Sequence, residues 1–328
     1  MLRDQAVPAP GPGEVRVEAI ASAVSAGTEL LVYRGEVPRD LPLDLPTLRG
    51  SYAFPIKYGY AVAGRVLDVG PEVEHLGDGD PVFVHHPHQE TFVVPATMPI
   101  RLPDGLDPSL GVFFANLETA LNIVHDTPLR LGETALVFGA GVVGLLVTRL
   151  LGLAGAGTVL VVDPLEGRRK LALAAGADDA VGPERADGRI MDATDGRGAD
   201  VAVEASGTGA ALRTAIGTVA AEGTVVVASW YGTKPVALDL GGHFHRGRVR
   251  LHSSQVGHLN PELAPRWDRS RRTETVLGLL ERLDLEALIS HRFPFDRAPE
   301  AYPLLEERPE EAAQVVFAYE SSRGGRDV

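Results

Sequence analysis

The chain has 328 residues, of which 45% are hydrophobic and 23% are charged, an ordinary composition for a globular protein. This length suggests two domains, each large enough to bury a core. The net charge of −13 argues against nucleic acid and against anionic membrane surfaces as partners. The absence of cysteine excludes disulfide bonds, cysteine-bound zinc, iron–sulfur clusters and a thiol nucleophile.

Neither a membrane span nor a secretion signal is indicated by the hydropathy pattern. The longest apolar run, residues 135–148, is interrupted by glycines and is too short to cross a bilayer. The first ten residues lack the apolar core of a signal peptide. We therefore expect a cytoplasmic protein with no membrane partner.

Residues 1–118 are expected to form short strands separated by glycine and proline. Residues 14–20 alternate polar and apolar side chains with a period of two, as in a half-buried strand. Residues 61–70 and 80–85 continue this pattern, whereas residues 34–55 predict a long irregular loop. Short strands at this spacing indicate a small β-barrel or sandwich.

From residue 134 the pattern changes to alternating strands and helices. Such alternation implies parallel strands with helices on both faces, an α/β domain. Strands are expected at 134–138, 158–162, 200–204 and 224–228, and helices at 142–153, 167–175 and 210–221. The last part of the chain predicts a polar loop at 261–272, a helix at 273–283, a strand at 314–319 and a disordered tail at 321–328.

The first strand of this second half is followed by a glycine-rich loop of the form G-x-G-x-x-G. Gly139 permits a tight turn, Gly141 lets a pyrophosphate approach the backbone, and Gly144 allows the helix to pack closely on the strand. Phosphates would accept hydrogen bonds from free N–H groups at the start of the helix. The predicted dinucleotide-binding loop is therefore Gly139, Ala140, Gly141, Val142, Val143 and Gly144.

Asp163 ends the next predicted strand, at the spacing expected for a ribose-binding acid. Its carboxylate would accept hydrogen bonds from the 2′-hydroxyl of NAD and repel the 2′-phosphate of NADP. We therefore expect NAD, with NADP as the less favoured cofactor. Arg168, on the following helix, is the cofactor-binding candidate that would soften this preference.

With the glycine loop, three further segments resemble the medium-chain dehydrogenase/reductase superfamily over nearly the whole chain. Residues 59–70, 25–29 and 203–207 are similar to its G-H-E-x-x-G-x-V-x-x-V-G, C-G-[ST]-D and E-A-[TS]-G segments. The resemblance implies a GroES-like β-barrel catalytic domain at 1–118 and a Rossmann NAD-binding domain with a doubly wound parallel sheet at 119–258. It also implies a C-terminal segment at 259–328 that returns to the catalytic domain, and a homo-oligomer, which we expect to be a dimer.

The positions of the family's catalytic zinc ligands carry other residues in this chain. The family uses Cys, His and a second Cys with a nearby Glu; Ala26 stands for the first Cys, Tyr60 for the His and Ala61 for the Glu. None of these supplies a normal zinc ligand. We expect no zinc, and the chain looks like the zinc-independent branches, in particular the bacteriochlorophyllide dehydrogenases.

A metal-free enzyme must polarise the substrate oxygen with hydrogen-bond donors and a proton relay. Thr28 matches the family hydroxyl that passes on the substrate proton, and Tyr60 stands where the ligand histidine would be. Each residue also has a structural interpretation, as a turn or cap threonine and as aromatic core packing.

The resemblance implies further site residues on two other segments, residues 116–119 and 203–207. Asn116 and Glu118 lie where the family's substrate meets the nicotinamide, and Thr119 corresponds to a residue beside the nicotinamide. Ser206, in the segment like E-A-[TS]-G, is a further cofactor-binding candidate. Ordinary polarity at a helix N-terminus is the structural alternative for residues 116–119.

Three histidines follow one another closely at positions 85, 86 and 88. On a strand, His86 and His88 would share a face and could bind a metal together with Glu90. We prefer a substrate-facing or proton-shuttling role for His86, and a place on the surface or barrel edge is the structural alternative.

These observations predict a zinc-independent, NAD-dependent oxidoreductase that moves a hydride between nicotinamide and a secondary alcohol or ketone. Its partner is then a small alcohol or carbonyl substrate. The alternatives are an NADPH-dependent quinone or enone reductase, a non-catalytic NAD(H)-binding protein, and a metal enzyme that uses the histidine cluster.

Overall fold

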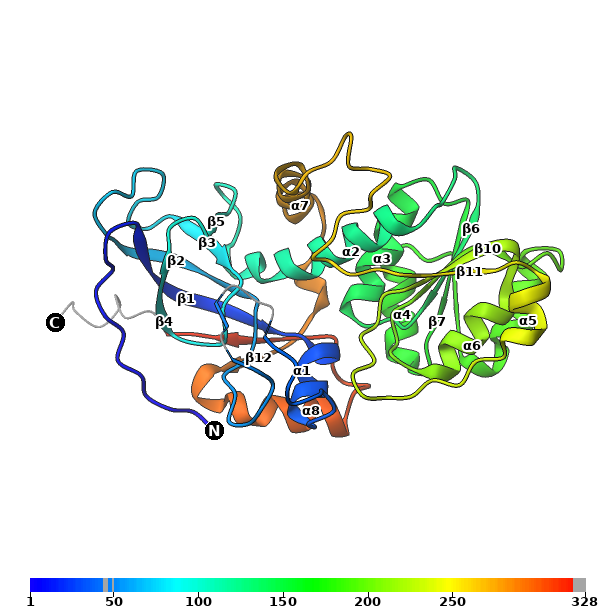
Figure 1. Ribbon diagram of the computed structural model, residues 1–328, viewed down its shortest axis with the longest axis horizontal. Helices are drawn as coiled ribbons and strands as arrows, with labels where there is room; N and C mark the ends of the chain where they lie inside the picture. Colours follow the sequence, from blue (N-terminus) through cyan, green and yellow to red (C-terminus); the bar gives the residue numbers. More distant parts are fainter. Residues whose placement is uncertain (44–46, 49, 321–328) are drawn as a thin grey trace. The chain divides into compact units, whose positions relative to one another are not determined.

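The computed structural model describes residues 1–43, 47–48 and 50–320, so the tail predicted at 321–328 lies outside the described residues. The chain divides into two compact units. Unit 1 consists of Met1–Ala115 with Leu277–Val328, and unit 2 consists of Asn116–Val276. In Figure 1, unit 2 runs from green to yellow, and unit 1 carries both the blue and the red end of the described chain.

Unit 1 is built on a seven-stranded sheet in which β1 is the central strand. The order is β12-β13-β1-β2-β3-β5, and β4 also pairs with β1. Strand β1 is antiparallel to β2, β4 and β13, whereas β12 and β13 run parallel. The strands are β1 (Glu14–Val24), β2 (Val62–Val69), β3 (Pro81–Val84), β4 (Thr91–Pro95), β5 (Ile100–Arg101), β12 (Ile289–Pro294) and β13 (Gln314–Ala318).

Apolar side chains hold this sheet and its helices together. Val15 and Val17 of β1 pack with residues of β2, β3 and β4 in one core. Helices α1 (Ala26–Tyr33) and α8 (Ala301–Glu307) share a second core with β13, which includes Leu30, Leu304 and Phe317. In the described part of residues 34–55 that follows α1, an isolated bridge between Pro42 and Ser51 is the only regular pairing, as expected for a loop.

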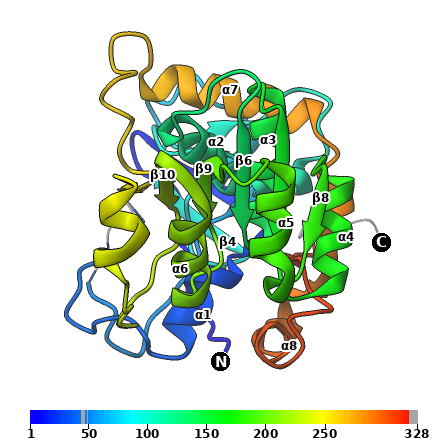
Figure 2. The same cartoon turned by 90° about the vertical axis from the view of Figure 1, so that its right-hand side faces the viewer.

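Unit 2 is a parallel six-stranded sheet with helices on both faces, so the predicted α/β fold is confirmed (Figure 2). The order is β11-β10-β9-β6-β7-β8, with α3 beside α4 and α5 beside α6. The strands are β6 (Thr134–Phe138), β7 (Thr158–Val162), β8 (Asp179–Val181), β9 (Ala199–Glu204), β10 (Val219–Val227) and β11 (Arg250–Ser253). The helices are α3 (Val142–Leu153), α4 (Glu166–Ala174), α5 (Ala186–Ala193) and α6 (Gly209–Thr218), with α2 (Phe114–Asp126) leading into the sheet.

The order of this sheet places a topological switch between β6 and β9. From β6 the chain continues to β7 and β8 on one side, and from β9 to β10 and β11 on the other. In open parallel sheets, ligands bind outside the carboxyl ends of the strands at such a switch. The glycine loop follows β6 directly and therefore lies at this point.

The structure differs from several sequence-based boundaries. Residues 269–272, expected in a polar loop, belong to a helix that begins at Arg269, and the strand expected at 224–228 begins earlier, at Val219. The helix expected at 210–221 ends at Thr218, because Val219 already pairs with Ala199 as the first residue of β10. The two units meet along the chain between Val276 and Leu277, within α7 (Arg269–Arg282), and the domain boundaries expected at 118 and 258 stay predictions.

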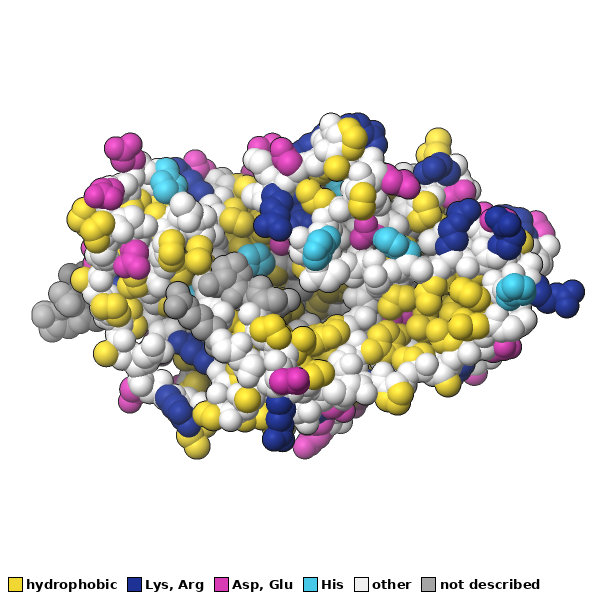
Figure 3. All heavy atoms as spheres, in the orientation of Figure 1, with side chains coloured by type: hydrophobic (Ala, Val, Ile, Leu, Met, Phe, Trp, Pro, Cys, Tyr) yellow, Lys and Arg dark blue, Asp and Glu magenta, His cyan; other side chains and the backbone are white. Residues whose placement is uncertain are grey.

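The remaining elements are short helical turns. They are η1 (Pro108–Phe113), η2 (Pro183–Arg185), η3 (Leu240–Phe244), η4 (Glu286–Leu288) and η5 (Phe295–Glu300). Of the helices in the described part of the chain, none has the length and hydropathy that a membrane crossing requires. Acidic and basic side chains are intermixed on the face drawn in Figure 3, and hydrophobic ones gather over unit 2.

Candidate functional site

The glycine loop of unit 2 has the geometry that a dinucleotide pyrophosphate requires. Gly139 has φ +100°, and a Cβ on Gly144 would lie 1.8 Å from the Gly139 carbonyl oxygen, so helix α3 packs tightly on the loop. A Cβ on Gly141, in contrast, would meet no atom within 4 Å. Gly141 is the N-cap of α3 and supplies no side-chain cap, so the first N–H groups of the helix have no intrahelical partner. The residues present therefore fit a bound pyrophosphate.

Asp163 fixes the shape of this loop. It is 2% exposed. Its Oδ2 accepts a hydrogen bond from the Ala140 N–H at 2.8 Å, and its Oδ1 accepts one from the Leu165 N–H at 2.9 Å. Each carboxylate oxygen keeps a second lone pair, which can accept a hydrogen bond from a ribose hydroxyl. The ribose contact of Asp163 stays a prediction. Arg168 is half-buried on α4, and its neighbour Arg169 donates to the Asp163 carbonyl oxygen at 2.8 Å.

A second buried carboxylate, which the sequence interpretation missed, organises the turn after β9. Glu204 is fully buried, and its Oε1 accepts hydrogen bonds from Ser206 N–H, Ser206 Oγ and Gly207 N–H. Its Oε2 accepts from the Tyr231 hydroxyl at 2.8 Å. Ser206 is exposed, but its hydroxyl is already engaged by Glu204, and its cofactor role stays a prediction. The segment that is similar to E-A-[TS]-G could have indicated this role of Glu204, because the glutamate stands at the end of the strand, directly before the turn.

Glu118 takes part in a buried ion pair in unit 2. Its Oε1 lies 2.7 Å from Nη2 of Arg272, whose side chain is 5% exposed. Arg272 Nη1 also donates to Asn122 Oδ1 at 2.9 Å and to the Val256 carbonyl oxygen at 2.8 Å. This arginine ties the segment before α7 to helix α2, which explains why unit 2 extends beyond residue 258.

For the other two candidates on α2, the structure gives the burial of the side chain but does not test a role in binding. Asn116 is buried and Thr119 is half-buried. Substrate or nicotinamide contacts of Asn116, Glu118 and Thr119 stay predictions. Sequence reasoning had no signal for Arg272, because it lies more than 150 residues from the glutamate that it pairs with.

In unit 1, three hydroxyl groups come together at the start of α1. Ser25 is the N-cap of this helix, and the side chains of Ser25 and Thr28 lie beside the Tyr60 hydroxyl and lower its pKa. Burial outweighs the effect of these two side chains and raises the pKa of Tyr60 above its ordinary value. The charge of the Glu29 carboxylate adds to the rise. Tyr60 is therefore a neutral phenol at physiological pH, a form that can donate a hydrogen bond, and its catalytic role stays a prediction.

Beside this group lies a buried hydrogen-bonded network. Glu29 is 2% exposed, and its Oε2 lies 2.8 Å from the Tyr302 hydroxyl and 3.0 Å from His88 Nε2. His88 Nδ1 lies 2.7 Å from Ser22 Oγ, which is 2.8 Å from the Tyr319 hydroxyl. Glu29 and His88 are functional candidates that the sequence interpretation missed, although the histidine cluster had drawn attention to the segment.

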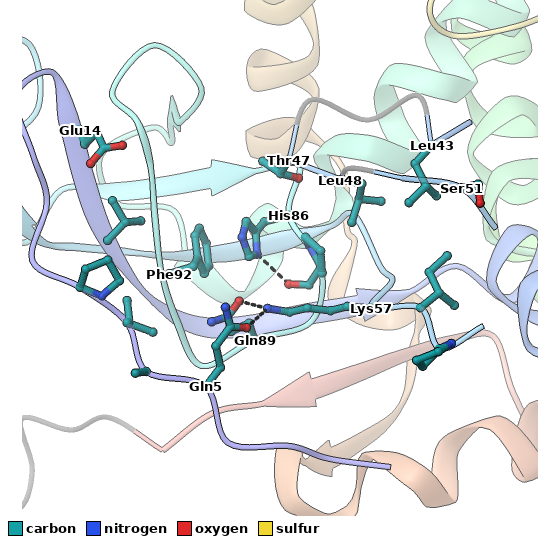
Figure 4. Close-up of a pocket in the computed structure, with 17 residues that line it drawn as sticks. Gln5, Glu14, Leu43, Thr47, Leu48, Ser51, Lys57, His86, Gln89 and Phe92 are labelled. Carbon is teal, nitrogen blue, oxygen red and sulfur yellow. Dashed lines mark hydrogen bonds between the residues drawn. The ribbon is translucent and has the colours of Figure 1, made fainter. Parts of the chain in front are cut away.

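His86 lies in a different environment, on the wall of a cavity of about 570 Å³ (Figure 4). Its ring stacks on Phe92 at 3.7 Å between centroids, and its Nδ1 lies 2.9 Å from the Pro87 carbonyl oxygen. Burial lowers the pKa of His86 to about 4, so the imidazole is neutral at pH 7. Near it, Lys57 donates to Gln5 and Gln89. The catalytic role of His86 stays a prediction.

The arrangement of the histidines argues against the alternative of a metal site at this cluster. Strand β3 ends at Val84, so the histidines do not share a strand face. His85 faces the Tyr60 carbonyl oxygen, His86 faces Phe92, and His88 faces Glu29. Throughout residues 1–43, 47–48 and 50–320, no three His, Asp or Glu side chains are grouped to hold a metal ion.

The family's zinc positions were tested against the side chains that occupy them. Ala26 and Ala61 have no donor atom, and the phenol of Tyr60 is held in its neutral form. Neutral phenol and methyl groups do not form the Cys and His donor set of a zinc site. The residues present therefore do not fit the zinc ion.

Comparison with known proteins places the chain in a family. Residues 142–269 match the family model described as zinc-binding dehydrogenase. D-Guloside 3-dehydrogenase of Escherichia coli K12 is 30% identical over 331 residues, covering 93% of this chain and 93% of that protein. L-Threonine 3-dehydrogenase of Pyrococcus abyssi is 30% identical over 346 residues, covering 95% and 92%. The structure of 2R,3R-butanediol dehydrogenase from Bacillus subtilis has a TM-score of 0.79 and 23% identity, covering 96% and 95% of the two chains. The chain therefore belongs to the medium-chain, zinc-binding type dehydrogenase family and is an oxidoreductase.

Proposed function

We propose that this protein is a zinc-independent, NAD(H)-dependent oxidoreductase that interconverts a secondary alcohol and a ketone. The observation that carries the proposal is the hydroxyl cluster of Tyr60, Ser25 and Thr28, in which Tyr60 stands at the position of the family's ligand histidine. The names of the three relatives, as dehydrogenases of a guloside, of threonine and of butanediol, support a secondary alcohol as the substrate class.

The dinucleotide is held by unit 2 in this proposal. N–H groups at the start of α3 bind the pyrophosphate beside Gly141, and Asp163 supports the loop and faces the ribose. When bound, NAD(H) supplies the hydride or accepts it. NAD is preferred over NADP because of the carboxylate at the end of β7. NADPH-dependent reduction of quinones or enones is the alternative, and it predicts the reverse cofactor preference.

The chemical role of the polar cluster follows from its protonation state. A neutral phenol at Tyr60 donates a hydrogen bond to a carbonyl oxygen and stabilises the negative charge that develops there during reduction. The hydroxyls of Ser25 and Thr28, which contact the phenol, pass a proton to or from it. General acid catalysis of this kind contributes about 10²–10⁴-fold to the rate.

The test is hydride transfer measured by nicotinamide absorbance with a panel of secondary alcohols, ketones and enones. Tyr60→Phe should lower kcat by about 10²-fold or more and leave NADH binding unchanged. Tyr33→Phe is the matched control, because Tyr33 is 49% exposed and lies outside the hydroxyl cluster. Equal kcat values for wild type and Tyr60→Phe would remove the proposed role of the phenol.

Zinc-independence has its own test. Protein dialysed against a chelator should keep its kcat, and added zinc should not raise it. A loss of kcat that zinc restores would contradict the proposal. The more specific placement beside bacteriochlorophyllide dehydrogenases remains a prediction, since none of the three relatives reported above carries that name.

We also propose a homodimer and a cytoplasmic location. Exposed apolar side chains on and near the edge strand β11 support the dimer: Leu251 is 40% exposed, Leu240 is 51% exposed and Trp230 is 38% exposed. Light scattering after gel filtration should give twice the chain mass, and Leu251→Glu should shift it to the chain mass.

A further inference from the structure

The Glu29 carboxylate is unusual because it is buried and has a specific partner for each oxygen. It is 2% exposed, and Oε1 accepts a hydrogen bond from the Ser25 N–H at 2.8 Å while Oε2 accepts from Tyr302 and meets His88. Within the part of the chain that the structure describes, His88 is the only contact of Glu29 that can carry a positive charge. Burial of a carboxylate without hydrogen-bond donors or a positive charge nearby is strongly disfavoured. The buried Glu29 side chain therefore depends on these three partners.

One side of the network fixes the turn that carries the hydroxyl groups. Ser25 is the N-cap of α1, and Glu29 bonds back to its N–H in addition to the helical bond from Glu29 N–H to the Ser25 carbonyl oxygen. The residues between them include Thr28. Both hydroxyls that contact Tyr60 therefore lie on a turn closed by the Glu29 side chain.

The other side of the network fixes the backbone that carries the phenol. A Cβ on Gly59 would lie 2.6 Å from His88 Cδ2, so the imidazole is in direct contact with the backbone next to Tyr60. The His88 N–H also donates to the Tyr58 carbonyl oxygen at 3.2 Å. The ring itself is held at both nitrogens, by Glu29 and by Ser22.

We propose that Glu29 and His88 are positioning residues that hold the Tyr60 hydroxyl between the α1 turn and the Gly59 backbone. The inference rests on the proposed function, in which Tyr60 meets the substrate oxygen. Glu29 and His88 themselves touch neither substrate nor cofactor in this scheme. The hydrogen bond between Glu29 and His88 joins the α1 turn to the Gly59 backbone. These side chains thereby fix the geometry that a metal ion would otherwise impose.

The carboxylate also acts on Tyr60 through its charge. Burial and the charges of Glu29 and Tyr52 raise the pKa of Tyr60, while the Ser25 and Thr28 side chains lower it. Loss of the Glu29 charge therefore lowers the pKa of Tyr60. Because the neutral phenol is the active form for carbonyl reduction, activity falls as pH rises through this pKa, and the alkaline limb of the profile moves to lower pH.

The decisive variant is Glu29→Gln, which keeps an acceptor for the Ser25 N–H and removes the charge. We expect kcat for reduction to fall about tenfold or more with KM within twofold, since small displacements of a catalytic group cost this much. We expect the Tyr60 titration to move to lower pH, because the Glu29 charge is one of the causes that raise the pKa of Tyr60. That titration is read from tyrosinate absorbance, as the difference between each protein and its Tyr60→Phe counterpart.

Glu18→Gln is the matched control, because Glu18 is a second buried carboxylate of unit 1, on β1, and should leave both measurements unchanged. An unchanged titration in Glu29→Gln overturns the inference, and so does an unchanged kcat. The titration requires no turnover, so a wild type without hydride transfer contradicts the proposed function alone. If Glu29→Gln does not fold, His88→Gln is measured instead: a tenfold lower kcat supports the inference and an unchanged kcat overturns it.

Discussion

A glycine at the N-cap of α3 and a second glycine within this helix allow a clean test of the dinucleotide site. Gly141 has φ −70° and open space where a Cβ would lie, so alanine fits its backbone conformation. Replacement of glycine by alanine at a compatible position stabilises a protein by about 0.4–1 kcal/mol through the unfolded state. Gly141→Ala should therefore fold with unchanged or slightly higher stability. A bound pyrophosphate, in contrast, would meet the new methyl group.

The expected size of the binding defect follows from the same geometry. We expect Gly141→Ala to weaken NADH binding at least tenfold, which corresponds to about 1.4 kcal/mol. Gly152→Ala is the matched control in α3, since a Cβ there also meets no atom within 4 Å. It should gain about 1 kcal/mol from helix propensity and keep the NADH affinity of the wild type.

The assay combines NADH fluorescence titration with urea unfolding of all three proteins. Gly144→Ala completes the series: its Cβ would lie 1.8 Å from a backbone oxygen, so stability itself should fall by several kcal/mol. Equal NADH affinity of Gly141→Ala and wild type would refute the reasoning, because the pyrophosphate then lies elsewhere.

Three further changes probe stability. Arg272→Met removes the guanidinium that lies 2.7 Å from the Glu118 carboxylate and should lower the free energy of urea unfolding by about 1–3 kcal/mol, which Glu118→Gln in the same chain should partly restore. Gly59→Ala would place a Cβ 2.6 Å from His88 Cδ2 at a residue with φ +109°, and it should lower the unfolding free energy by about 1–3 kcal/mol. Gly79→Ala, with φ +85° and open space around the Cβ, measures the cost of the backbone conformation alone. For His86, the folded pKa of about 4 lies below the unfolded value of about 6.5, so its contribution is complete above pH 6.5 and falls as pH drops toward 4. The unfolding free energy should therefore decrease by about 2 kcal/mol between pH 7.5 and pH 5, and His86→Phe should flatten that part of the pH profile.

The local elements of unit 2 could be predicted because their sequence signals are local. Continuous apolar runs at 134–138 and 158–162 match β6 and β7, since strands covered on both faces have no polar alternation. The helix at 142–153 matches α3 because glycines mark its start. The end of the helix at 210–221 was wrong because the pairing of Val219 with Ala199 depends on a distant strand.

The polar contacts of the candidate sites could be predicted only in part. The positions of Tyr60 and Thr28 follow from the family pattern, but the network around Glu29 does not. Tyr302 lies 273 residues from Glu29, and Tyr319 lies 297 residues from Ser22, so no spacing rule joins them. Of the clustered histidines, the one that reaches this network was selected by tertiary packing and not by alternation along a strand.

The position of β13 has a consequence for the order of folding during synthesis. This strand pairs with β1, and Ala21 lies opposite Ala318, so the central strand of unit 1 lacks one neighbour until almost the whole chain has left the ribosome. Unit 2 is encoded by one continuous stretch and can close earlier. Tyr302 and Tyr319 arrive with the last strand and helix of unit 1. The network around Glu29 is therefore completed last, and a nascent chain can hold a finished Rossmann-like fold before the side chains around Tyr60 are in place.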